Sequence, residues 1–254
     1  MRRLLSDTLV VTQRNLIRLP RAPELLLAFT LQPIMFVLLF RYVFGGAISV
    51  PGVSYAEYLI PGIIVQNIAF GGFVTALGLN EDMQKGLIDR FRSLPMARAA
   101  VLAGRTSADI VTNCLAMTIL ILTGLIIGFS FQTSVLHVIV GLILAVTFGY
   151  AFSWVFAFLG LIVKTPEAAN SVGFLAVFPL TFISSAFVPG QSLPTPLRQF
   201  SDVNPFTIIV NELRWLWTGQ PSPDQLWQAF AWVVFILVVF APLAVQRYRR
   251  AAGQ

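Results

Sequence analysis

The sequence predicts an all-α polytopic membrane protein with six transmembrane helices. Of its 254 residues 57% are hydrophobic and only 11% are charged, whereas soluble domains are about 45–50% apolar and about 25% charged. The mean hydropathy is +0.80. Uncharged stretches of about 20 residues, the length that crosses a bilayer core, recur along the chain. We expect spans at about 25–44, 58–79, 107–128, 135–163, 168–188 and 226–246.

Basic residues indicate how these spans are oriented. Of the 17 Lys and Arg residues, five precede the first span, five lie in 81–105, one is Lys164 and three follow the last span. Only Arg198 and Arg214 fall in the opposite loops, and Arg41 lies at the end of a span. Because an excess of Lys and Arg marks cytoplasmic loops, we expect a multi-pass protein of the cell (inner or cytoplasmic) membrane with both termini in the cytoplasm. The net charge of +6 then reflects orientation and contact with anionic lipid, and no nucleic-acid partner is expected.

Residues 1–22 are expected to form an amphipathic helix at the cytoplasmic membrane surface. The segment has two early arginines but no continuous apolar stretch and no small-residue cleavage site, unlike a signal peptide. An apolar face opposite a basic face is typical of interfacial helices, and a partner-binding helix remains an alternative. Residues 23–254 would form one transmembrane domain. At 100° per residue the apolar face holds Leu5, Leu9, Thr12, Leu16 and Leu19, and the polar face holds Asp7, Arg14, Arg18 and Arg21.

The densest charge cluster of the chain lies between two uncharged stretches. Residues 81–105 carry eight formal charges. On a helical wheel Met83, Leu87 and Phe91 share one side and the charges occupy the other. Pro95 would end this helix, because proline has no backbone donor and disfavours a helical residue before it. A short amphipathic helix at 81–95 is suited to docking on a soluble protein, and a solvated connecting loop is the alternative.

Residues 189–225 form a long connection on the opposite side, with six prolines. An unstructured loop of this length would be unusual in a folded domain. Asn204 followed by Pro205 predicts a helix N-cap and a first helical residue. The apolar helix that follows is either an interfacial helix anchored by Trp215 and Trp217 or a helix that dips into the membrane.

The sequence contains no recognisable catalytic or metal site. It has no G-x-x-x-x-G-K-[ST] motif for nucleotide, and the single His137 excludes histidine-based triads and H-E-x-x-H sites. The single Cys114 excludes an internal disulfide and a thiolate metal site. Asp109 is expected at the cytoplasmic N-terminus of a span, where a carboxylate is favourable. Without ionisable groups at mid-membrane, any energy source is expected on another polypeptide.

The segment 81–105 has an acidic start at Glu81 and Asp82, then Gly86, the run DRFRSLP at 89–95, and Gly104 followed by Arg105. It resembles the cytoplasmic segment of the ABC-2 family of transport permeases, and especially its daunorubicin-resistance branch. Two further segments resemble the same family. Residues 159–189 are similar to the family's fifth span, and residues 193–219 to the extracellular segment that follows it. The chain has SSAFVP where the family often has glycine near Ser185, a form that fits the drug-resistance branch.

This resemblance implies a permease subunit that is not itself an enzyme and carries no cofactor. Two copies of a separate ATP-binding subunit would hold ATP and magnesium, and the permease would pair with a second copy of itself. Residues 81–95 would be a coupling helix, and residues 189–219 a re-entrant segment that closes the outer exit. The expected ATPase contacts are Leu87, Asp89, Arg90, Phe91, Arg92 and Pro95. The expected outer-gate residues are Pro189, Asn204, Pro205 and Trp215.

The resemblance also implies export of hydrophobic or amphiphilic compounds, such as drugs or secondary metabolites. Export of a lipid or a lipid-linked saccharide is the alternative, and a non-transporting membrane assembly protein is a second one. An apolar lateral opening would favour drugs or lipid, and an open aromatic tunnel would favour a saccharide. Four polar residues at membrane depth are candidates for the pathway or for helix–helix hydrogen bonds. These are Gln32, Gln66, Asn67 and Asn113.

Overall fold

The computed structural model describes residues 2–18, 23–46, 48, 50, 53–84, 98–220 and 225–251. Regular structure in this part of the chain is entirely helical, which confirms the prediction of an all-α protein. The α-helices are α1 (Arg2–Arg18), α2 (Pro23–Leu39), α3 (Tyr55–Gly71), α4 (Phe73–Gln84), α6 (Arg98–Ile126), α7 (Val135–Ile162), α8 (Pro166–Phe182), α9 (Thr195–Val203), α10 (Pro205–Thr218) and α11 (Leu226–Ala251). A π-helical turn, η2 (Phe40–Phe44), continues α2, and a 3-10 turn, η3 (Gly190–Ser192), precedes α9.

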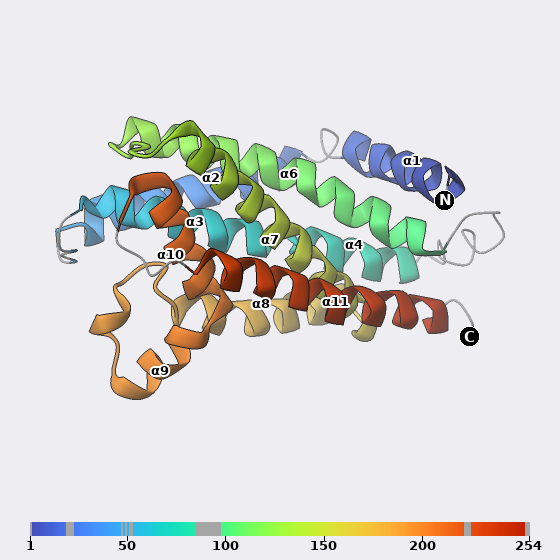
Figure 1. The fold of residues 1–254 in the computed structure, drawn as a ribbon. Helices are drawn as coiled ribbons and strands as arrows, with labels where there is room; N and C mark the ends of the chain where they lie inside the picture. Colours follow the sequence, from blue (N-terminus) through green and yellow to red (C-terminus); the bar gives the residue numbers. More distant parts are fainter. Residues whose placement is uncertain are drawn as a thin grey trace.

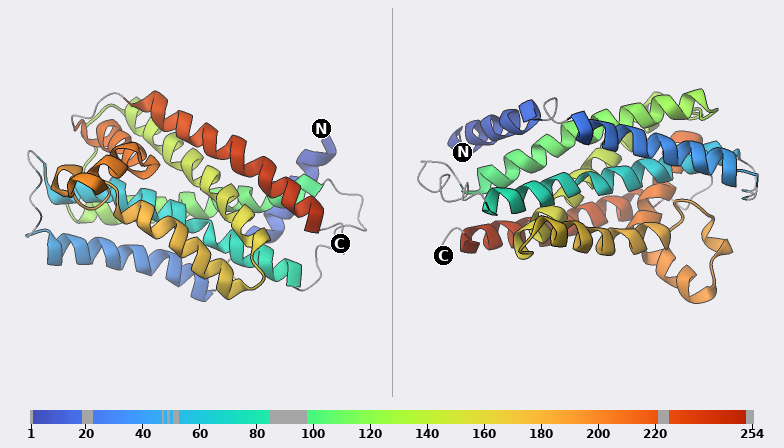
Figure 2. Two further views of the ribbon diagram at one scale, coloured as in Figure 1. Left: turned by 90° about the horizontal axis from the view of Figure 1, so that it is seen from below. Right: turned by 180° about the vertical axis from the view of Figure 1, so that it is seen from behind.

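The long helices lie side by side and form an elongated bundle (Figures 1 and 2). Helix α7 is its centre, because it packs against α3, α4, α6, α8, α10 and α11. Both termini, the end of α4 and the start of α6 lie at one end of the bundle, and α9 lies at the other (Figure 1).

The packing around α7 depends on large buried rings and on close backbone contacts. Phe148 and Phe156 of α7 are fully buried. At Gly160 a Cβ atom would lie 2.5 Å from the main-chain oxygen of Ala76, so glycine is required for the close approach of α4. The helix begins at a cap, because the Ser134 side chain accepts a hydrogen bond from the His137 backbone N–H.

Four helical stretches in the described residues are long and apolar enough to cross a membrane. They are Tyr55–Gln84, Ala100–Ile126, Val135–Ile162 and Leu226–Arg250, and a shorter apolar helix covers Leu31–Phe44. Since about 20 apolar residues are needed for each crossing, this part of the chain fits a multi-pass membrane protein.

Several helices differ from the expected spans. Helix α6 has 29 residues and begins at Arg98, nine residues before the expected start at 107. The expected span 58–79 contains two helices, α3 and α4, which meet at Gly72, and α4 continues through residues 81–84. Helix α8 ends at Phe182 instead of 188, and Asn204 Nδ2 donates to the terminal carbonyl oxygens of Leu180 (2.7 Å) and Ile183 (2.8 Å).

Helix α1 packs obliquely across α6 (Figures 1 and 2). Thr12 Oγ1 donates to the Gly104 carbonyl oxygen at 3.0 Å, and Val11 is buried. The contact depends on Gly104, where a Cβ atom would lie 2.6 Å from Val11 Cβ. Leu9, expected on the same apolar face as Thr12, is 68% exposed. The buried side of α1 is therefore set by the groove at Gly104 and not by the apolar stripe alone.

Candidate functional site

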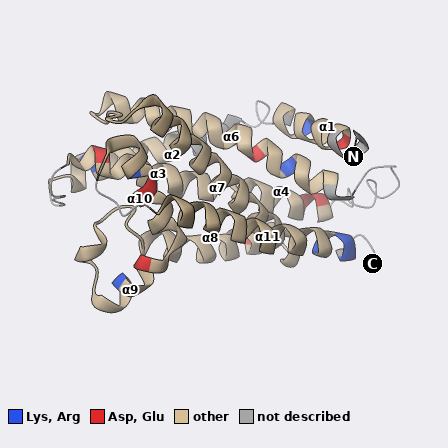
Figure 3. Ribbon diagram, viewed as in Figure 1, with Lys and Arg blue, Asp and Glu red and all other residues tan. Residues whose placement is uncertain are grey.

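The segment expected to contact an ATP-binding subunit lies mostly outside the described residues. This applies to Leu87, Asp89, Arg90, Phe91, Arg92 and Pro95, which all fall in 85–97. Its two neighbours are described, because α4 ends at Gln84 and α6 begins at Arg98. Basic residues on α1, α6 and the end of α11 gather at this end of the bundle (Figure 3).

The opposite end is built around a helical hairpin of α9 and α10. Asn204 caps α10, since its Oδ1 accepts from the Phe206 N–H at 2.9 Å, and Pro205 is the first helical residue. The predicted cap is therefore confirmed. The same Asn204 side chain holds the end of α8 through its Nδ2. Pro189, half-buried, directly precedes η3.

Helix α10 is built into the bundle and packs against α3, α7 and α11. Trp217 is fully buried, and its Nε1 donates to the Val138 carbonyl oxygen at 3.3 Å. Trp215 is half-buried, and its ring centre lies 5.5 Å from that of His137 in an edge-to-face arrangement. Trp217 therefore does not anchor a surface helix, as the interfacial alternative required.

A buried arginine, which the sequence did not single out, ties α10 to its neighbours. Arg214 is 3% exposed. Its Nε donates to the Tyr58 carbonyl oxygen (2.8 Å), and its Nη2 donates to the carbonyl oxygens of Ser185 (2.7 Å) and Ala186 (3.0 Å). Its Nη1 donates to Asn211 Oδ1 (3.1 Å) and Ser185 Oγ (3.4 Å), and the guanidinium carbon lies 3.4 Å from the centre of the Tyr58 ring. All its nitrogens are engaged, so this side chain is a structural clamp.

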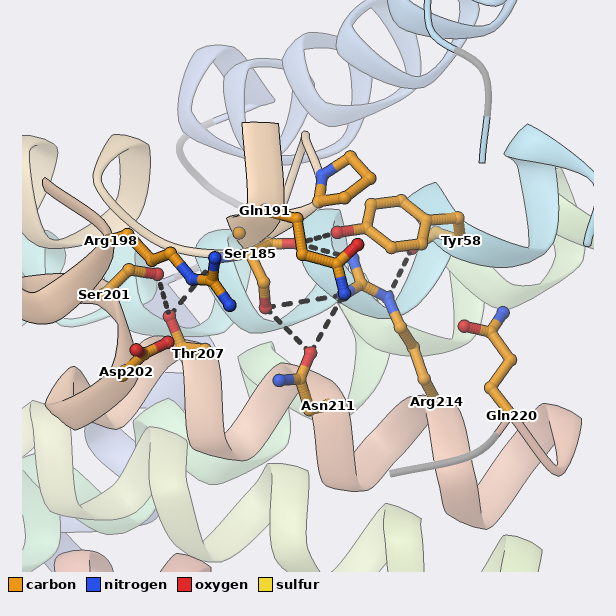
Figure 4. Close-up of a pocket in the computed structure, with 12 residues that line it drawn as sticks. Tyr58, Ser185, Gln191, Arg198, Ser201, Asp202, Thr207, Asn211, Arg214 and Gln220 are labelled. Carbon is orange, nitrogen blue, oxygen red and sulfur yellow. Dashed lines mark hydrogen bonds between the residues drawn. The ribbon is translucent and has the colours of Figure 1, made fainter. Parts of the chain in front are cut away.

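A polar cavity of about 280 Å³ opens beside this clamp (Figure 4). Its walls come from α3, α9, α10 and the segment between α8 and α9. Ser201 Oγ and Thr207 Oγ1 are 3.0 Å apart across its floor. Arg198 and Asp202 of α9 also line it, and both are exposed. The clamp thus borders a solvent-accessible cavity at the α9–α10 end of the bundle.

The four polar residues considered for a pathway are not brought together. Gln32 is exposed on α2, and Gln66 and Asn67 are half-buried on α3. Asn113 is buried on α6 against Gly71, and its Nδ2 has no hydrogen-bond partner. Within the described chain none of the four forms the helix–helix hydrogen bond considered as their alternative role.

Asp109 differs from its expected position at a helix N-terminus. Because α6 starts at Arg98, Asp109 lies about three turns inside the helix. It is 5% exposed, and its Oδ2 accepts from Thr75 Oγ1 at 2.7 Å. The expectation was wrong because the helix continues past the charged residues that limit the apolar window. Asp109 therefore joins α6 to α4 and does not cap α6.

A continuous row of phenylalanine rings runs along α8 and on to η2, the turn that continues α2. The rings of Phe174 and Phe178 are 4.7 Å apart, and those of Phe178 and Phe182 are 4.2 Å apart. The row continues through Phe187 (5.1 Å from Phe182) to Phe40 (4.7 Å from Phe187). Phe174 and Phe178 are 49% and 38% exposed on the lateral surface. Their stacked arrangement offers an apolar, aromatic surface at the side of the bundle.

Comparison with known proteins gives consistent matches over most of the chain. The profile of the ABC-2 type transporter family matches residues 6–218. The daunorubicin resistance ABC transporter permease protein DrrB1 of Streptomyces coeruleorubidus is 31% identical over 244 residues, which cover 96% of this chain and 86% of the relative. The "Probable doxorubicin resistance ABC transporter permease protein DrrC" of Mycobacterium tuberculosis is 25% identical over 253 residues, which cover 99% and 91% of the two chains.

Proposed function

The chain belongs to the ABC-2 type transporter family, and from that membership we propose that it is the permease subunit of an ATP-driven exporter of hydrophobic or amphiphilic compounds. Its resemblance to the daunorubicin-resistance branch is confirmed by relatives named for resistance to daunorubicin and doxorubicin. These names support a drug or secondary metabolite with fused aromatic rings as the cargo.

The proposed assembly contains two copies of this chain and two copies of an ATP-binding subunit. The absence of a nucleotide-binding motif from the sequence supports a separate polypeptide as the site of ATP and magnesium binding. We propose six spans, adding α2 with η2 and α8 to the four long helical stretches. The basic end of the bundle would face the cytoplasm, and α9 and α10 would form a re-entrant hairpin at the outer end.

The observation that carries the choice of cargo is the row of phenylalanine rings on α8. A planar aromatic compound can stack on such rings, and each aromatic pair contributes about 0.5–1.5 kcal/mol beyond area burial. The row lies at the side of the bundle, where a compound dissolved in the bilayer would reach it directly. A lateral apolar surface favours drugs or lipid over a saccharide, and the aromatic row favours drugs over lipid.

Substitution of one ring tests this proposal against its alternatives. We expect Phe178→Ala to weaken the apparent affinity for daunorubicin export by about 2- to 10-fold, because one stacking partner is lost. Leu175→Ala is the matched control, since Leu175 is a 74% exposed apolar residue of the same helix outside the row. The assay uses vesicles that contain the permease and its ATP-binding subunit, with daunorubicin and a fluorescent phospholipid as cargoes. Equal effects of both variants, or transport of the phospholipid alone, would contradict the proposal.

We propose further that residues 81–95 couple ATP hydrolysis to the spans. Phe91 would anchor the contact with the ATP-binding subunit, and Asp89 and Arg92 would fix its register. Phe91→Ala is expected to cost about 2 kcal/mol of binding free energy, and charge reversal at Asp89 or Arg92 should weaken assembly further. The measurements are co-purification of the ATP-binding subunit and stimulation of its activity by substrate. A solvated loop would tolerate all three changes within about 0.5 kcal/mol.

A further inference from the structure

A buried ionic cluster lies between the helices on either side of segment 85–97. Asp82, in the last turn of α4, accepts a hydrogen bond from Arg105 Nη1 of α6, with 3.0 Å between Nη1 and Oδ2. Their side chains are 5% and 10% exposed. Arg14 of α1 places its Nη2 3.7 Å from the same Asp82 oxygen, and its side chain is 36% exposed. Three helices that are separate in sequence therefore share one carboxylate.

The backbone around the cluster is shaped to hold Arg105. A Cβ atom at Gly78 would lie 1.4 Å from Arg105 Nη2, so the guanidinium occupies space that only glycine leaves free. The same Nη2 donates to the Val74 carbonyl oxygen at 3.4 Å. Next to Arg105, Gly104 receives the hydrogen bond from Thr12 of α1. Arg105 is thus fixed to α4 at two points, and α1 is fixed to α6 beside it.

The cluster joins the two ends of segment 85–97. Asp82 lies two residues before the end of α4, and Arg105 lies seven residues after the start of α6. A buried ion pair is stiff, because separating its members leaves an uncompensated charge away from water. Helix α4 is continuous with α3 except at Gly72, and α3 carries Tyr58, which contacts the Arg214 clamp at the outer end. A displacement at Asp82 can therefore pass along α4 and α3 to the Arg214 clamp at the other end of the bundle.

We propose that Asp82, Arg105 and Arg14 form a positioning cluster that makes α1, α4 and α6 move as one body when segment 85–97 is displaced. The proposal rests on the proposed coupling function of that segment. The cluster itself does not contact the ATP-binding subunit in this proposal. Its role is to transmit the displacement to the spans, so its loss separates ATP hydrolysis from export without releasing the subunit.

The test uses the assembled transporter in vesicles and daunorubicin as the cargo. Asp82→Asn keeps the shape of the side chain and removes its charge. We expect unchanged co-purification of the ATP-binding subunit and a fall of about tenfold in daunorubicin exported per ATP hydrolysed, within the 5- to 150-fold range typical of coupling between sites. Asp82→Glu, which retains the charge, should restore most of the export. Glu167→Gln, an exposed acidic residue at the start of α8, is the control and should behave as the parent protein.

Each outcome decides the proposal. Export per ATP that is unchanged in Asp82→Asn would overturn it, and so would a loss of export that only follows a loss of bound ATP-binding subunit. If Asp82→Asn does not reach the membrane, Arg14→Gln tests the cluster at its partly exposed member. A several-fold fall in daunorubicin exported per ATP would then support the proposal, and an unchanged ratio would overturn it. A normal Phe91→Ala variant would instead refute the coupling function of residues 81–95. A defective Phe91→Ala with a normal Asp82→Asn would refute the cluster alone.

Discussion

Replacement of Arg214 by methionine removes the clamp between α10 and α3 while keeping a long apolar side chain. Arg214 Nε and Nη2 donate to three main-chain oxygens, those of Tyr58, Ser185 and Ala186. In Arg214→Met the Tyr58 and Ala186 oxygens lose this donor, whereas the Ser185 oxygen keeps the hydrogen bond that Tyr58 Oη donates to it at 2.7 Å. The cation–π contact with the Tyr58 ring is lost as well.

The expected cost follows from these acceptors. A buried polar group left without a hydrogen bond costs about 1–3 kcal/mol. Water from the adjacent cavity of about 280 Å³ can reach this region, and the variant no longer buries a guanidinium, so the lower value applies. Two acceptors at about 1 kcal/mol each, together with about 0.5–1 kcal/mol for the lost cation–π contact, give a loss of about 3 kcal/mol. For a chain of this size 1 kcal/mol corresponds to about 2–4 °C in Tm, so Tm should fall by about 6–12 °C.

The assay is thermal unfolding of the purified protein in detergent, followed by intrinsic tryptophan fluorescence. Arg198→Met is the matched control, because Arg198 lines the same cavity but is exposed, and exposed substitutions usually change stability by less than about 0.5 kcal/mol. A Tm for Arg214→Met equal to that of Arg198→Met would refute the assignment of Arg214 as a structural clamp.

Three further predictions follow from the topology, the missing nucleotide site and the helix packing. In a background without the native cysteine, a cysteine at Thr195 should be labelled by an impermeant reagent outside intact cells and one at Asp89 should not; the opposite pattern would reverse the proposed orientation. The purified chain alone should not hydrolyse ATP, and activity should appear when the ATP-binding subunit is added; hydrolysis by a contaminant-free preparation of the chain would contradict the assignment. Gly62→Ala should lower the free energy of unfolding by about 1–3 kcal/mol, because its Cβ would lie 2.2 Å from the Ala186 carbonyl oxygen. Gly46→Ala, where nothing lies within 4 Å, should be neutral in the same thermal assay.

The sequence located the helices better than their ends. The uncharged stretch 135–163 corresponds closely to α7 at Val135–Ile162. The window expected at 107–128, which already includes Asp109, was too short because Arg105 limited it. In the folded chain both residues are buried beside polar partners, and α6 therefore continues through them. An apolar window predicts the part of a helix that contacts lipid. The helix itself can be longer, because polar residues that form hydrogen bonds inside the bundle can extend it.

At the site, contacts between residues close in sequence could be predicted, whereas contacts between distant residues could not. The Asn204 cap could be predicted because its partner is only two residues away. The burial of Arg214 could not, because its acceptors lie 28, 29 and 156 residues away in sequence. The spacing of Phe174, Phe178 and Phe182 is visible as i, i+4 steps on one helix face. Its continuation from Phe187 to Phe40 requires the tertiary structure.

The position of α10 also constrains how the chain is made. The hydrogen bond between Arg214 Nε and the Tyr58 carbonyl oxygen joins residues 156 positions apart. At about 5–20 residues per second, a ribosome needs about 8 to 30 s to synthesise that interval. During this time α3 is completed first and α7 follows, while α10 is still absent, so the Tyr58 oxygen lacks its Arg214 partner for the whole interval. The end of the bundle that contains α10 is therefore completed late in the synthesis of the chain.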